Sequence, residues 1–133
     1  MLPSVRYARL WEAQLESLAT EGNVIFIFEL RSKPGRGDEL IAAIRKFDFT
    51  DDNPMNNDPA NLKDGVLCRD PEDPDHFFMI GEWKSATAHR EALVRALAQG
   101  TPPFFELMDG GFSPSKYLDV VMSAPPGYLT KTA

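Results

Sequence analysis

The chain has 133 residues, of which 43% are hydrophobic and 26% charged, and its formal net charge is −6. This length suits a single domain with its own core, and no apolar run approaches the roughly 20 residues of a membrane-spanning helix. An acidic chain without clustered Lys and Arg is poorly suited to bind a phosphate backbone, so nucleic acid is excluded as a partner. The first residues lack the pattern of a signal peptide. We therefore expect a cytoplasmic protein with no membrane partner.

The N-terminal segment Ser4–Ala19 predicts an amphipathic helix that ends before Gly22. Residues 1–22 are accordingly predicted to be a helical extension, residues 23–122 the main domain and residues 123–133 a flexible C-terminal tail. The apolar side chains of the extension recur at three- and four-residue spacing: Tyr7, Leu10, Trp11, Leu15 and Leu18.

The main domain opens with a continuous apolar run, Val24–Phe28, which is typical of a strand covered on both faces. Lys33-Pro34-Gly35 breaks this strand, and Asp38 and Glu39 then favour the first turn of a helix that ends near Phe47. The polar segment from Asp48 to Asp64 is too long for a simple connection and is a candidate lid.

The second half of the chain predicts a hairpin, a capped helix and a last strand. Asp70–Asp75 has the composition of a turn, and Ser85 can cap the helix that follows the hairpin. The predicted elements are strands at Gly65–Arg69, His76–Trp83 and Lys116–Met122, a helix at Ser85–Ala98 and a short helical turn at Phe104–Met108.

This order, βαββαβ after an extra N-terminal helix, is the ferredoxin-like arrangement of an α+β fold. Its four-stranded sheet carries helices on one face only. Because the first strand is apolar on both faces, we expect the other face to be buried in a homodimer, sheet against sheet, forming a dimeric α+β barrel.

Two short motifs add a resemblance to a known family. Lys33-Pro34-Gly35 lies between a strand and a helix, and Glu82-Trp83-Lys84-Ser85 lies between a later strand and a second helix. In this respect the region Asn23–Val121 resembles the antibiotic biosynthesis monooxygenase family. That family includes quinol and anthrone oxygenases, haem-degrading enzymes and isomerases, so the resemblance implies a fold more specifically than a reaction. The chain departs from the family pattern at Asn53–Asp64, where relatives have a short Gly-containing turn.

Strand alternation places Trp83 and Met79 on one face of the sheet, and the resemblance implies that this face lies toward the helices, where relatives bind their ligands. The helical stripe of the next helix turns His89 inward, at the position where some relatives carry a pocket residue six positions after this Trp. The residues predicted to line the substrate site are Phe26, Phe28, Phe77, Met79, Leu93, Phe104 and Tyr117, with His89 and Trp83 as candidate catalytic residues.

An aromatic cavity with one titratable group suits a small flat aromatic molecule. Without a metal or an organic cofactor, dioxygen takes electrons only from an electron-rich substrate that has lost a proton. His89 is the candidate base and Trp83 the stacking surface. The sequence thus predicts a cofactor-independent monooxygenase that acts on a quinol, anthrone or polyketide-like substrate. Met79 stands where some oxygenases of the family carry Asn.

Two alternatives remain open. The domain could be a noncatalytic binding or assembly module whose cavity is filled by its own side chains, or an isomerase or cyclase that uses His89 without dioxygen. A haem-degrading activity ranks lower, because Phe28 stands near the expected haem contact. Both candidate catalytic residues also have a purely structural alternative. His89 could be a buried core residue bonded to a backbone carbonyl, and Trp83 could simply pack in the core.

The remaining reactive side chains are interpreted as structural. Cys68 is expected to be a small buried hydrophobe, and His76 to lie exposed or at the dimer edge. Glu82 is expected to face the dimer side, where a partner such as an Arg of the second subunit would neutralise it. An acidic run lacks the pattern of a calcium loop and is interpreted as a solvated loop rather than a metal site: Asp48, Asp51, Asp52 and Asp58.

Overall fold

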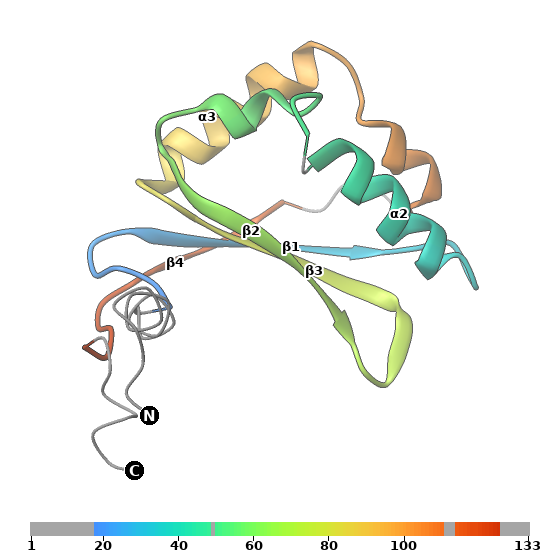
Figure 1. Cartoon of the computed structure of the whole chain (residues 1–133), viewed down its shortest axis with the longest axis horizontal. Helices are drawn as coiled ribbons and strands as arrows, with labels where there is room; N and C mark the ends of the chain where they lie inside the picture. Colours follow the sequence, from blue (N-terminus) through green and yellow to red (C-terminus); the bar gives the residue numbers. More distant parts are fainter. Residues whose placement is uncertain (1–17, 49, 111–113, 126–133) are drawn as a thin grey trace, which may run out of the picture.

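The computed structural model describes residues 18–48, 50–110 and 114–125 (Figure 1). Nearly all of the predicted N-terminal helix and the end of the predicted tail lie outside these residues. The described elements are β1 (Val24–Arg31), α2 (Gly37–Asp48), η1 (Pro54–Asn57), β2 (Asn61–Asp70), β3 (Asp73–Trp83), α3 (Ala86–Ala98), η2 (Pro103–Leu107) and β4 (Lys116–Asp119).

The four strands form one sheet in the order β2-β3-β1-β4, with each pair antiparallel. Both helices lie over the same face of this sheet (Figure 1). This is the ferredoxin-like α+β arrangement, so the predicted fold class is confirmed. The predicted cap is also present, because the Ser85 hydroxyl accepts a hydrogen bond of 3.0 Å from the Ala88 amide.

Two strands differ in length from the strands predicted from the sequence. β2 begins at Asn61 rather than Gly65, because the backbone of Asn61 and Lys63 pairs with the end of β3 through register shifts. β4 ends at Asp119, short of the predicted Met122. Backbone pairing continues wherever a neighbouring strand is available, and this is not encoded in the alternation of one segment.

The core lies between α2 and the sheet. Leu40 and Ile44 of α2 are fully buried against the helix-covered face of β1 and β3. Further core residues come from these strands and from the segment around η2: Phe28, Leu30, Phe77, Phe104 and Met108.

None of the described helices lies over the other face of the sheet, which we call the open face (Figure 1). Alternation along β1 buries Val24, Phe28 and Leu30 toward the helices and leaves Ile25 and Ile27 half-buried on the open face. The helices thus cover one face of this strand as predicted, and the cover expected from a second subunit on the other face stays a prediction. The open face carries further apolar side chains and also charged or polar ones. The apolar ones are Val66, Cys68, Phe78, Ile80 and Leu118, and the others include Glu29, Arg31, His76, Glu82 and Lys116.

Cys68 is exposed, so the prediction of a buried thiol is wrong for the single chain. The reason is its register. Cys68 lies opposite Phe78, on the side of the sheet away from α2 and α3.

Glu82 also faces this side, but its neutralising partner comes from its own chain. Its Oε2 accepts hydrogen bonds from Asn23 Nδ2 at 2.7 Å and the Thr20 amide at 3.1 Å, and Lys63 Nζ lies 3.3 Å from Oε1. Burial acts to raise the pKa of Glu82, yet these donors outweigh it and the pKa is lowered. The expected Arg from a second subunit is not needed.

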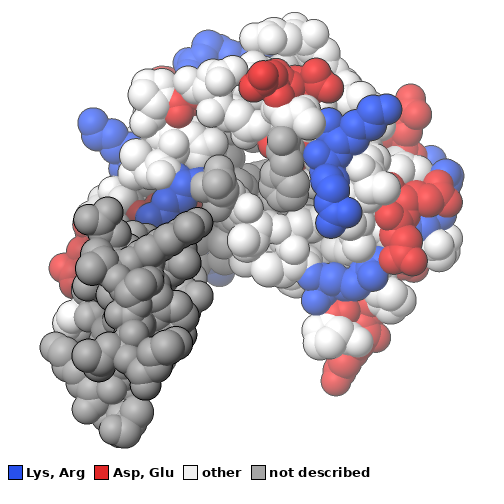
Figure 2. Space-filling view, in the orientation of Figure 1, with Lys and Arg blue, Asp and Glu red and all other residues white. Residues whose placement is uncertain are grey.

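The surface carries charges of both signs. Figure 2 shows Lys and Arg distributed among Asp and Glu rather than joined in one continuous basic surface on this face. In the described part of the chain, no helix has the length and apolar character needed to cross a membrane.

Candidate functional site

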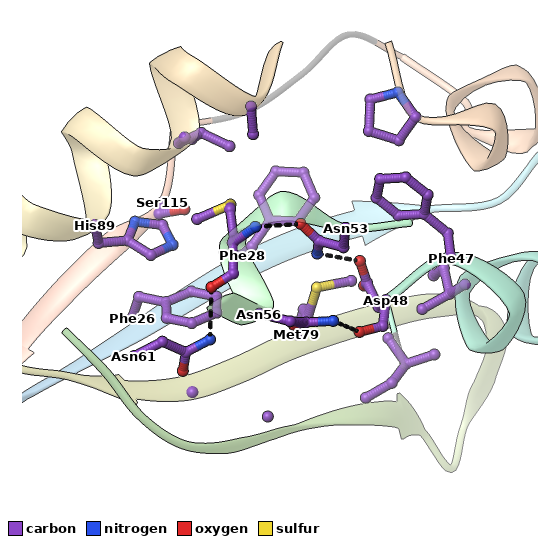
Figure 3. A pocket seen from close by; sticks show the side chains of 18 of the residues that line it. Phe26, Phe28, Phe47, Asp48, Asn53, Asn56, Asn61, Met79, His89 and Ser115 are labelled. Atoms are coloured by element: carbon purple, nitrogen blue, oxygen red, sulfur yellow. Dashed lines mark hydrogen bonds between the residues drawn. The ribbon is translucent and has the colours of Figure 1, made fainter. Parts of the chain in front are cut away.

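A cavity of about 780 Å³ lies between the helix-covered face of the sheet and the helices. Its walls come from β1, β2, β3, the end of α2, α3, η2 and the segment between α2 and β2 (Figure 3). This volume falls in the range of pockets for small molecules, about 300 to 1,000 Å³. We call the end that holds Phe26, Trp83 and His89 the aromatic end, and the end that holds Asp48 the polar end, although Phe47 also lies beside Asp48 (Figure 3).

The aromatic end is built around Phe26, Trp83 and His89. The rings of Phe26 and His89 are stacked with their centroids 4.3 Å apart, and the Trp83 ring meets His89 edge-on at 5.0 Å. Gly81 makes this arrangement possible, because a Cβ at that position would lie 2.5 Å from Cε1 of Phe26. Because Gly81 has no side chain, the Phe26 ring can lie over the backbone of β3 at this position.

His89 is only 3% exposed, and its Nδ1 lies 2.7 Å from the hydroxyl of Tyr117. Burial, together with the nearby charge of Arg90, lowers the pKa of His89 to about 4. Burial raises the pKa of Tyr117, so its hydroxyl keeps its proton. When that hydroxyl donates to Nδ1, the imidazole is neutral and carries its proton on Nε2, which then acts as a hydrogen-bond donor.

The polar end contains Asp48, the last residue of α2. Its Oδ1 accepts a hydrogen bond of 2.9 Å from Asn53 Nδ2, and its main-chain oxygen accepts one of 2.6 Å from Asn56 Nδ2 (Figure 3). Among the residues that the structure describes, its buried Oδ2 has no hydrogen-bond partner. Burial raises the pKa of Asp48 to about 6, although the hydrogen bond from Asn53 acts in the opposite direction.

The interpretation of the acidic run as a solvated loop is therefore wrong for Asp48. A signal for its position was present in the sequence. Asp48 follows Ile44 by four residues, so it lies on the buried stripe of α2 rather than on the solvent face.

The segment between α2 and β2 forms the wall beside Asp48. The Asn53 side chain accepts a hydrogen bond from the Met55 amide at 3.0 Å and so caps η1, while Asn61 Nδ2 donates to the Met55 carbonyl at 3.2 Å. Met55 and these amides border the cavity. The segment thus covers the cavity, and its role as a lid stays a prediction.

Most of the residues predicted for the site border this cavity: Phe26, Phe28, Met79, Trp83, His89, Leu93 and Phe104. Two do not. Phe77 is 0% exposed, pairs with Leu30 and lies under the Arg69 guanidinium, 5.0 Å from its ring centroid. It is a core residue, because its register places it beyond the aromatic end. Tyr117 contacts the cavity indirectly, through His89.

No family model and no curated protein matches the chain. The fold itself is similar to solved structures. A protein of Chloroflexus aurantiacus named as an antibiotic biosynthesis monooxygenase shares 24% identity over 79% of this chain and 99% of its own, with a TM-score of 0.51. One of the same name from Bordetella bronchiseptica has 14% identity over 77% and 100%, with a TM-score of 0.61.

The chain has the antibiotic biosynthesis monooxygenase fold. The same fold occurs in MhuD of Mycobacterium tuberculosis, a heme degrader solved with two hemes in its active site, at 19% identity over 74% of this chain and 96% of that one, with a TM-score of 0.56. Proteins of this fold thus have different activities. At these sequence identities the structural similarity supports the fold and not the reaction. The reaction has to be argued from the cavity.

Proposed function

We propose that this protein is a monooxygenase that oxidises a small aromatic substrate, such as a quinol, an anthrone or a related polyketide, without a metal or organic cofactor. The observation that carries the proposal is the aromatic end of the cavity, where Phe26, Trp83 and a neutral His89 converge. A flat ring can stack in such a site, and an apolar wall limits access of water to a reactive intermediate.

The reaction requires little from the protein. Loss of a proton makes the substrate electron-rich enough to reduce dioxygen. For an anthrone, the ring methylene and O₂ become a ring carbonyl and water, so atoms and electrons balance without another reactant. The cavity would orient the substrate and stabilise its anion.

His89 and Trp83 are the residues proposed to act on the substrate. Trp83 would hold the aromatic ring, and the Nε2–H of His89 would donate a hydrogen bond to the substrate oxygen. Nε2 of the neutral imidazole carries this proton when the Tyr117 hydroxyl donates its hydrogen bond to Nδ1. The pKa of about 4 makes His89 a weak proton acceptor near pH 7, so electrostatic stabilisation is the role that fits it better.

The cavity volume counts against a module filled by its own side chains, since Phe26, Phe28 and Leu93 border an open space beside His89. An isomerase or cyclase would use the same cavity without consuming dioxygen. Oxygen dependence separates these two functions.

The proposal includes a homodimer. The open face of the sheet carries Ile25, Ile27, Phe78 and Ile80, and neither α2 nor α3 lies over them. Burial of apolar surface is favourable by about 25 cal/mol per Å². A second copy that places its own open face against it would bury both sets of side chains at once.

The experiment is dioxygen uptake by the metal-stripped protein with a panel of hydroquinones and anthrones, with Trp83→Phe and His89→Gln measured beside the wild type. We expect substrate-dependent uptake that falls about 10- to 1,000-fold in the His89→Gln variant, the range for one oxyanion donor. Conversion of a substrate without oxygen consumption would support the isomerase instead.

A further inference from the structure

We propose that Asp48 is the group that takes the proton from the substrate, while His89 at the other end of the cavity holds the substrate oxygen. This inference rests on the proposed function and adds to it a catalytic residue and a substrate geometry. Asp48 lies outside the family motifs, and its chemistry follows from its surroundings alone.

Asp48 and His89 both border the cavity, but they come from α2 and α3 and lie at opposite ends of it (Figure 3). A substrate that fills the space between them meets the imidazole at one end and the carboxyl group at the other.

The carboxylate of Asp48 is incompletely hydrogen-bonded within the described residues. Asn53 satisfies Oδ1, but Oδ2 is shielded from water and has no partner within the described residues. A buried carboxylate oxygen without a donor is costly, and it gains a hydrogen bond when a donor on a ligand or a proton reaches it. The end of α2 adds to this effect, because the helix dipole disfavours a negative charge at its C-terminus.

Asp48 is also the more basic of the two groups. With a pKa of about 6 against about 4 for His89, Asp48 is the stronger base by a factor of about 100. Near pH 7 most of its carboxyl groups are ionised and ready to accept a proton. A pKa close to the working pH is the condition under which a general base is most effective.

The titratable groups on the elements around Asp48 do not duplicate this role. Asp51 and Lys63 border the cavity but are exposed, and the charged side chains of α2 and η2 next to Asp48 are exposed as well: Arg45, Lys46 and Glu106. Asp48 is the described cavity carboxylate that is both shielded and incompletely bonded.

These two ends select a substrate class. The acidic O–H or C–H bond must face Asp48 while an oxygen across the ring faces His89, which is the para relationship of the two hydroxyls of a hydroquinone and of the methylene and carbonyl of an anthrone. In the step itself, the substrate O–H or C–H bond breaks, the proton forms an Oδ–H bond on Asp48, and the electron pair stays on the substrate. Dioxygen then takes electrons from that anion.

The test compares Asp48→Asn with Asp52→Asn, a matched loss of one carboxylate from an exposed residue of the neighbouring loop that does not border the cavity. The first measurement is anaerobic binding of 1,4-dihydroxynaphthalene between pH 5 and 8. We expect the wild type and Asp52→Asn to lose affinity up to about tenfold per pH unit as the pH falls below about 6, because protonation of Asp48 removes the acceptor. The dissociation constant of Asp48→Asn should be independent of pH.

The second measurement is aerobic turnover of the same compound and of anthrone. We expect kcat to fall about 100- to 10,000-fold in Asp48→Asn and to be unchanged in Asp52→Asn. Turnover that survives in Asp48→Asn overturns the inference and leaves the oxygenase intact. Binding with the predicted pH dependence but no dioxygen uptake keeps the Asp48 contact and overturns the proposed function. Binding that is independent of pH in the wild type, or the absence of binding, overturns the assignment of Asp48 to this substrate class.

Discussion

The imidazole of His89 and the hydroxyl of Tyr117 lie 2.7 Å apart, although they come from α3 and β4 and are separated by 28 residues. The contact joins a helix that covers the sheet to the short edge strand beneath it. His89 is buried and Tyr117 half-buried. When the hydroxyl donates to Nδ1, the imidazole proton lies on Nε2 and His89 offers a hydrogen-bond donor to a ligand.

Replacing Tyr117 by Phe removes this contact and keeps the ring. We expect a loss of about 0.5 to 1.5 kcal/mol in the free energy of unfolding and a larger relative loss of turnover, since the imidazole is no longer held in one tautomer. Nitrogen chemical shifts of His89, measured by NMR, report the tautomer directly. Unchanged shifts in Tyr117→Phe would mean that Tyr117 does not set the protonation of His89.

Gly81 is predicted to be indispensable for the aromatic end. In Gly81→Ala the new methyl group collides with the Phe26 ring, which lies 2.5 Å from its position. We expect destabilisation of about 1 to 3 kcal/mol and weaker binding of aromatic ligands, measured by denaturant unfolding and by titration. Adding Phe26→Leu to Gly81→Ala should restore part of the stability, and no recovery in the double variant would locate the strain elsewhere.

The two shielded titratable groups predict opposite dependences of stability on pH. His89 has its pKa lowered to about 4, so between about pH 6.5 and 4 the unfolded chain binds its proton first and stability falls as the pH is lowered. Asp48 has its pKa raised to about 6, so between about pH 6 and 4 the folded chain binds its proton first and stability rises as the pH is lowered. The two contributions partly cancel in the wild type.

Single substitutions should separate them. Asp48→Asn is expected to gain about 1 to 3 kcal/mol at pH 8 and to lose stability more steeply than the wild type between pH 6 and 4, whereas His89→Gln should show the reverse slope. Urea unfolding at pH 4, 6 and 8 measures both. Parallel curves for all three proteins would contradict the shielded state of these groups.

Glu82 is predicted to be a stabilising carboxylate. Glu82→Gln replaces an acceptor of two hydrogen bonds, from Asn23 and Thr20, by an amide that also has to place its own NH₂ group. We expect a loss of about 1 to 3 kcal/mol, measured by urea unfolding at pH 7. Lys63→Met is the control, because the half-exposed ammonium should contribute less than about 1 kcal/mol. The reverse order would make the ion pair the main interaction.

The proposed homodimer can be tested at Ile80, at the centre of the open face. Ile80→Asp should dissociate the dimer and leave the fold of the single chain intact, measured by light scattering and circular dichroism. Val94→Asp is the matched control on the exposed surface of α3, where the side chain is 69% exposed. A wild type that is monomeric at all concentrations would remove the dimer from the proposal.

The local sequence determined most of the secondary-structure elements of this protein. The apolar run of β1, the apolar stripe of α2, the Ser85 cap and the glycine and proline breaks specify the type and order of the elements, because each depends on a few neighbouring residues. For the same reason the inward direction of His89 could be derived from one helical stripe.

The tertiary structure decided what those elements bring together. Register placed Phe77 in the core, Cys68 on the open face and Asn23 and Lys63 beside Glu82. Packing of the Asn53 segment over the end of α2 shielded Asp48 and gave it its raised pKa. Burial and charge at a site are sums over segments distant in sequence, so a local pattern can place a side chain on a face but cannot supply the groups that will surround it.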